Sequence, residues 1–223
     1  ALGCRLINVK SDLRHMFGDV RDQGARPTCL VFATSDVHAS IRAGAWEPLC
    51  CEYAYYHAVH YSHNDPSRGV DIDSILHTIR VTGQPYEKHW PYLKTIPSDR
   101  ALWVPPVAMS PLFRRNSQKC ADTLTELFDC IDRTIPVVVG MTISNAFYKP
   151  GRGGVINSNE PVDHARRHAV VGLGHGIRDK QRHLLIRNSW GDSWGEKGYA
   201  WISEQYLEPR ILAYVKFTED LTN

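Results

Sequence analysis

The stretch DQGARPTCLVFATSDVHASIRAG, residues 22–44, predicts a glycine-containing turn that runs directly into an amphipathic helix. Its apolar residues recur at helical spacing, and a glycine ends the pattern: Leu30, Ala33, Val37, Ile41 and Gly44. Cys29 falls in the first turn, where backbone N–H groups and the helix dipole favour the nucleophilic thiolate over the thiol. Gln23, six residues earlier, could bring a side-chain amide donor to the same place. Because a helical cysteine is more often a small core residue, this stretch alone does not establish chemistry.

The composition is that of a globular chain without a strongly charged surface. The 223 residues are 43% hydrophobic and 22% charged with a formal net charge of +2, which favours neither nucleic acid nor a membrane as a partner. No apolar run is long enough to cross a bilayer, and no signal-peptide pattern is present. Six irregularly spaced cysteines predict neither a disulfide scaffold nor a zinc site, and we interpret Cys50 and Cys51 as core or half-buried thiols. We expect no metal or other cofactor, and the cellular compartment stays open.

Helices dominate the first half of the sequence and strands the second. Periodicity predicts helices over 52–62, 71–82 and 123–133, the last with a capping-box pattern at Thr123 and Glu126. Apolar, β-branched runs predict strands over 135–143, 168–176, 183–189, 198–203 and 211–217. This segregation predicts an α+β fold with a site in a cleft between two lobes. We expect one domain over 1–223, with a helical lobe at roughly 22–110 and a β lobe at roughly 111–223; the N-terminal strand could cross over between them.

Two residues of the strand-rich half could complete a site with Cys29. His168 begins the apolar run HAVVGLGHG, where a strand can hold its ring rigidly. Asn188 could accept a hydrogen bond from His168 Nδ1–H and so orient the ring, shielded from water by Trp190 and Trp194. A nucleophile, a base and an orienting group are what thiol-based acyl transfer requires.

These residues and the surrounding motifs resemble the papain family of cysteine peptidases. The most specific motif is RNSWGDSWGEKGYAWIS at 187–203, and DVRDQG at 19–24 is similar to the family's turn before the nucleophile. The stretch 83–92 and PVVVG at 136–140 also resemble the family, closest in pattern to its disulfide-poor bacterial members. The resemblance implies a two-lobe fold with an N-terminal helical lobe and a C-terminal antiparallel β-barrel-like lobe. It also implies the roles of four residues: Cys29 as nucleophile, His168 as acid and base, Asn188 as orienting group and Gln23 as oxyanion donor.

The chain departs from the family pattern beside the nucleophile. The family usually has Cys-Gly-Ser-Cys-Trp there, whereas residues 26–30 are Arg-Pro-Thr-Cys-Leu, so the first cysteine and the disulfide that it forms in the family are absent. Gly69 is the nearest candidate for the glycine pair that binds the substrate backbone, and Trp190 is a second candidate substrate-binding residue. We therefore expect an altered rim around an intact catalytic core.

Other histidines compete for a functional role. His164 follows Asp163, a pairing that suits a general base, but the sequence after it does not resemble the family, so we favour His168. His57, His60 and His63 share a helical face at a spacing that could bind metal. No carboxylate partner is evident near them, and we interpret them as a solvated stripe.

The expected function is a cysteine endopeptidase that cleaves peptide bonds through a thioester. A protein or peptide substrate and a pro-segment or inhibitory partner are the expected partners. Residues 1–21 are too few for the family's pro-segment, so we expect a mature or excised domain. Two alternatives stay open: a thiol-dependent deamidase or transpeptidase acting on one protein substrate, and a non-catalytic papain-like binding module.

Overall fold

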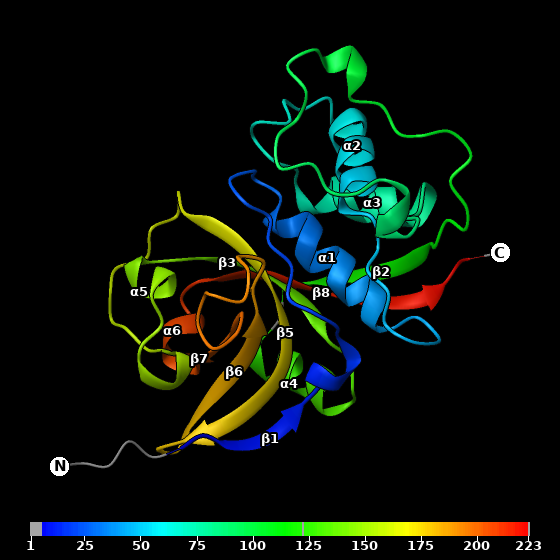
Figure 1. Cartoon of the computed structure of the whole chain (residues 1–223). Helices are drawn as coiled ribbons and strands as arrows, with labels where there is room; N and C mark the ends of the chain where they lie inside the picture. The colour runs from blue at the N-terminus through cyan, green and yellow to red at the C-terminus, as the bar shows by residue number, and fades with distance from the viewer. Residues whose placement is uncertain (1–5, 122, 223) are drawn as a thin grey trace. The chain divides into compact units, whose positions relative to one another are not determined.

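The computed structural model describes residues 6–121 and 123–222. The chain divides into two compact units (Figure 1). The β unit contains the residues up to Asp22 together with Lys119–Lys216, and the helical unit contains Gln23–Gln118 together with the residues from Phe217 onward. No helix in the described ranges is both long and apolar enough to cross a membrane.

The β unit is built on one largely antiparallel sheet. The strands of the sheet follow the order β2-β8-β3-β5-β6-β7-β4, with β2 at Arg115–Cys120, and β1 pairs with β5. The order is linear, so the described strands form an open sheet, which is compatible with the expected barrel-like lobe. The strands and helices of this unit have these bounds: β1 Asn8–Asp12, α4 Leu124–Asp132, β3 Val137–Thr142, α5 Asn145–Tyr148, β4 Val155–Ile156, β5 Arg167–Arg178, β6 Gln181–Arg187, β7 Tyr199–Ser203, α6 Glu204–Leu207 and β8 Ile211–Asp220, whose end lies in the helical unit.

The β5–β6 hairpin is the framework of this unit, and it is the long yellow and gold pair of arrows in Figure 1. Its turn places Asp179 and Lys180 at φ 50° and 65°, the left-handed pair that matches the twist of a two-residue hairpin. Val171 pairs with Arg187 across the hairpin, so the first residue after β6 lies near the beginning of β5. The predicted strands at 168–176 and 183–189 correspond to β5 and β6, the second of which ends at Arg187, and the structure pairs them.

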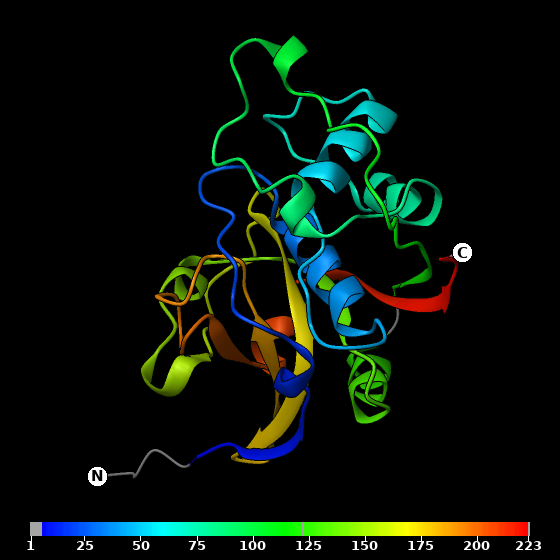
Figure 2. The same cartoon turned by 45° about the vertical axis from the view of Figure 1, so that its right-hand side comes forward.

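The helical unit contains three helices of ten to twelve residues, and both views show α2 beside α3 (Figures 1 and 2). Their bounds are α1 Cys29–Ser40, α2 Cys51–Ser62 and α3 Ile72–Val81, and short 3-10 turns follow at Glu87–His89 and Arg100–Leu102. Strand β2, Arg115–Cys120, begins in this unit, where Arg115 forms a 2.6 Å ion pair with Asp220 near the chain's end. The predicted helices at 52–62 and 71–82 are confirmed to within a residue.

Helix α1 differs from the amphipathic helix that its spacing predicted. Every residue from Val31 to Ala39 is buried, and the helix ends at Ser40, ahead of Gly44. Two of the buried polar side chains have partners outside the helix: Ser35 accepts from Gln84 Nε2 at 2.6 Å, and His38 Nδ1 lies 3.0 Å from Gln84 Oε1. Periodicity assumes a solvated polar face, which these contacts replace.

Helix starts show which side chains serve as caps. Asp71 Oδ1 accepts from Ser74 N at 2.8 Å, as an N-cap carboxylate does. Cys50 caps α2 with its thiol, which accepts from Tyr53 N and donates to the Trp90 carbonyl. The capping box predicted at Thr123 is wrong, because the Thr123 side chain makes no cap hydrogen bond. Of the two possibilities for Cys50 and Cys51, core or half-buried thiols, their complete burial shows the first.

The buried imidazole of His38 predicts acid-sensitive stability. Burial lowers the pKa of His38 from its ordinary 6.5 to about 4, helped by Arg115 and Arg42 and opposed by Gln84 and Asp220. Between these values the unfolded chain binds more protons than the folded one, so stability is fully present above pH 6.5 and falls as the pH drops toward 4, by about 3 kcal/mol. Urea unfolding at pH 7 and pH 4.5 should show a smaller pH difference for His38→Leu than for the wild type. An unchanged difference would contradict the assignment.

Candidate active site

The β unit holds the predicted base and its orienting group together. His168 is the second residue of β5, and Asn188 directly follows β6. The β5–β6 register brings them together across twenty residues of sequence, with His168 Nε2 2.8 Å from Asn188 Oδ1. Both side chains are buried.

The hydrogen-bond pattern fixes which ring nitrogen carries the proton. Asn188 Oδ1 also accepts from Ser189 N at 2.9 Å, so the atom facing the ring is the amide oxygen. An oxygen acceptor requires a donor, and His168 Nε2 therefore bears the hydrogen. The expectation that Nδ1 would bond Asn188 is wrong, because Asn188 reaches the far end of the ring. Nδ1 is consequently the basic nitrogen of the neutral ring.

Aromatic side chains surround this histidine. Trp190 lies 4.7 Å and Phe147 5.3 Å from the His168 ring, centroid to centroid. Trp194 packs on Phe147 and Trp190 instead, so the expected shield of two tryptophans consists of Trp190 with Phe147. Burial lowers the pKa of His168 to about 4, and the Asn188 hydrogen bond opposes that shift. No sequence motif marked Phe147, whose position follows only from the packing of α5.

Trp190 also lines a pocket of about 670 Å³ in the β unit. Tyr148 stacks on its ring at 5.4 Å, and Lys149, Arg152 and Glu196 contribute charged groups to the same wall. The half-buried indole thus joins the His168 environment to a pocket with both charge signs.

The helical unit holds the predicted nucleophile. Cys29 is the first residue of α1 and is partly exposed, so its thiol lies in the first turn as the sequence predicted. Two hydrogen bonds hold the turn that precedes Cys29: Thr28 N and Gln23 Nε2 both donate to the Arg26 carbonyl at 2.8 Å. A side-chain amide carries two N–H donors, so this bond fixes the direction of the second Gln23 N–H.

Gly69 packs against the same turn of the helical unit. Its φ is +78°, and an added Cβ would lie 2.8 Å from the Pro27 carbonyl oxygen. Only glycine combines this backbone conformation with this approach. Gly69 is therefore beside the residues that precede Cys29, while its contact with substrate stays a prediction.

The sequence as a whole matches a family model described as papain family cysteine protease over residues 8–212. The chain belongs to the papain family of cysteine proteases. A cysteine protease of Blomia tropicalis is 26% identical over 210 residues, which cover 89% of this chain and 61% of that protein. The chain thus spans less than two thirds of that relative.

Solved papain-family structures confirm the papain-like α+β fold. Xylellain, a cysteine protease from Xylella fastidiosa, has a TM-score of 0.75 at 22% identity, over 96% of this chain and 87% of that one. The Carica candamarcensis cysteine protease CMS1MS2, solved in complex with E-64, has a TM-score of 0.73 at 22% identity, over 93% and 97% of the two chains. Because such different organisms supply the relatives, the bacterial pattern of this papain-family chain stays a prediction.

The competing histidines of this papain-family chain have other surroundings. Asp163 forms a 3.0 Å ion pair with Arg166, and His164 is exposed. His60 Nδ1 lies 2.8 Å from the Tyr56 carbonyl within its own helix. Among residues 6–121 and 123–222, no group of three or more His, Cys, Asp or Glu side chains is placed to hold a metal ion.

Proposed function

We propose that this chain is a cysteine endopeptidase acting through Cys29, His168 and Asn188, with all of 1–223 forming one peptidase domain. The observation that carries the proposal is the hydrogen bond between His168 Nε2 and Asn188 Oδ1, which makes Nδ1 the basic nitrogen. Membership of the papain family and the position of Cys29 at the beginning of α1 support it.

The proposed reaction passes through a thioester. His168 Nδ1 accepts the proton of the Cys29 thiol, and Sγ attacks the carbonyl carbon of the scissile peptide bond. The C–N bond then breaks while His168 gives the proton to the leaving amine. Water, deprotonated by the same nitrogen, attacks the thioester and releases the thiolate with the new carboxyl group. Asn188 holds the ring throughout without adding charge.

The oxyanion formed in each half-reaction needs hydrogen-bond donors. The Cys29 backbone N–H and the Gln23 side-chain amide are the proposed donors, and the bond from Gln23 to the Arg26 carbonyl supports a fixed amide direction. Preorganised donors of this kind are commonly the largest single contribution to catalysis.

The proposed substrates are proteins or peptides. Gly69 is proposed to bind substrate backbone, and Trp190, with its 670 Å³ pocket, to accept substrate residues on the leaving-group side. We also propose a pro-segment or an inhibitory partner, as the resemblance to papain-like peptidases implies.

The direct test is labelling of the folded chain with E-64, followed by mapping of the adduct. We expect one adduct on Cys29, absent from Cys29→Ser and strongly slowed in His168→Ala. Burial raises the pKa of Cys50 to about 12, so this thiol provides an internal control that stays unlabelled. A folded wild-type chain without an adduct on Cys29 would overturn the proposal.

Product analysis of a cleaved protein separates hydrolysis from the two alternatives. Shortened chains indicate an endopeptidase, whereas an intact chain whose amide has become an acid indicates a deamidase. Tight peptide binding without either product indicates a binding module.

A further inference from the structure

A bidentate ion pair is buried beneath the turn that precedes Cys29. Arg26 Nη1 and Nη2 donate to Glu52 Oε2 and Oε1 at 2.6 and 3.0 Å. Arg26 is 8% exposed and Glu52 is fully buried. Two desolvated charges at this distance are costly unless their remaining hydrogen-bonding groups are also satisfied.

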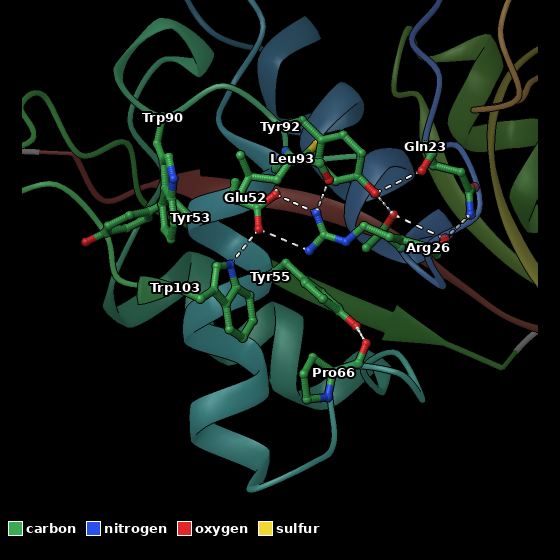
Figure 3. A network of polar contacts seen from close by, with 12 residues as sticks. Gln23, Arg26, Glu52, Tyr53, Tyr55, Pro66, Trp90, Tyr92, Leu93 and Trp103 are labelled. Carbon is green, nitrogen blue, oxygen red and sulfur yellow. Dashed lines mark hydrogen bonds and ion pairs between the residues drawn. The ribbon is translucent and has the colours of Figure 1, made fainter. Parts of the chain in front are cut away.

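The surroundings satisfy the carboxylate and enclose the guanidinium, as Figure 3 shows. Glu52 accepts two further hydrogen bonds, from Trp103 Nε1 at 2.7 Å and from Leu93 N at 2.9 Å. The Arg26 guanidinium carbon lies 4.7 Å from the Tyr92 ring centroid and 5.1 Å from that of Tyr55, within cation–π range. Arg26 therefore has one well-defined position.

The main-chain carbonyl of Arg26 accepts hydrogen bonds within the turn that precedes Cys29. The donors are Gln23 Nε2 and Thr28 N, both at 2.8 Å. Tyr92 also holds this turn. Its hydroxyl donates to the Gln23 carbonyl at 2.9 Å and lies 2.7 Å from Thr28 Oγ1. A tyrosine hydroxyl has one hydrogen, so Thr28 is the donor in the latter bond.

We propose that Arg26 is a positioning residue, whose anchorage by Glu52 and Tyr92 fixes the carbonyl that orients the Gln23 amide toward the oxyanion. This inference rests on the proposed peptidase function and assigns no contact between Arg26 and substrate. A small displacement of an oxyanion donor is sufficient to slow catalysis greatly. The anchored side chain thus acts through the backbone atom that Gln23 uses.

The test compares a reaction that needs the oxyanion donor with one that does not. Hydrolysis of a peptide amide forms an oxyanion, whereas iodoacetamide is attacked by the Cys29 thiolate with a new S–C bond and loss of iodide. We expect Gln23→Ala to lower kcat by about 10²-fold or more. Arg26→Met should lower kcat by about 10-fold or more with little change in KM, while the alkylation rate of Cys29 stays within about twofold.

Three further variants make the result specific. The double variant Gln23→Ala with Arg26→Met should be no slower than Gln23→Ala alone, since both changes remove the same donor. Lys88→Met, which breaks the exposed 2.8 Å ion pair with Glu47 in the same unit, is the matched control and should leave kcat unchanged. Tyr92→Phe removes one hydroxyl only and should give a smaller loss of kcat with the same unchanged alkylation.

Several results would overturn the inference. Full kcat in Arg26→Met, an alkylation rate that falls in parallel with kcat, or additive losses in the double variant would each do so. If Arg26→Met does not fold, Tyr92→Phe decides the question by the same two rates. Failure of the proposed peptidase function gives a different result, because the wild type would then leave the peptide uncut. If only the positioning role fails, the wild type still cleaves the peptide and Gln23→Ala still has a much lower kcat.

Discussion

Replacement of Cys29 by alanine should lower kcat/KM for a peptide substrate by at least about 10⁴-fold, with the fold intact. Alanine removes the sulfur that forms the proposed thioester. His168→Ala should cost a similar factor, because the proposed ring both takes the thiol proton and gives a proton to the leaving amine. Stopped assays with a fluorogenic peptide at saturating and subsaturating concentrations provide kcat and KM separately.

The two changes should not add. A nucleophile and its base act as one unit, so the double variant should be about as slow as either single variant. Cys130→Ala is the matched control, because Cys130 is a buried thiol whose pKa is raised by its burial. Hydrolysis that persists in Cys29→Ala, or disappears equally in Cys130→Ala, would refute the assignment of the nucleophile.

Replacement of Glu52 by leucine should destabilise the chain by about 3–5 kcal/mol, the cost of leaving a buried charge unpaired. The change leaves the Arg26 guanidinium, whose side chain is 8% exposed, without its carboxylate partner. It also removes the acceptor of Trp103 Nε1 and Leu93 N. Each unsatisfied donor adds to the penalty. Urea denaturation, followed by fluorescence at pH 7, measures the change in free energy of unfolding.

A double variant separates the pair from its parts. Arg26→Met together with Glu52→Leu removes both charges and should recover a large part of the lost stability. The corresponding changes in the exposed Lys88–Glu47 pair should each cost less than about 1 kcal/mol. Equal losses at the buried and exposed pairs would show that burial of the Arg26–Glu52 pair has no energetic weight.

Local sequence patterns predicted a helix or strand correctly where residues close in the chain account for which of its side chains are buried. Helix α3 buries one face, with Ser74, Ile75, Thr78 and Ile79, and strand β3 is a short β-branched run. Helix α1 departs from its predicted one-sided pattern, because Gln84, more than forty residues away, bonds the buried side chains of Ser35 and His38. Periodicity cannot represent a partner so distant in the chain.

The sequence by itself determined the family, the order Cys29, His168, Asn188 and the placement of Cys29 at the beginning of a helix, because these depend on residue type and local spacing. Only the tertiary structure decided that Nε2, rather than Nδ1, faces Asn188, and that Phe147 covers the ring. It also decided that Arg26 is paired with Glu52 rather than exposed at the rim. The reason is physical: hydrogen-bond direction and charge burial depend on atoms brought together by strand register and helix packing, and residue spacing along the chain carries neither.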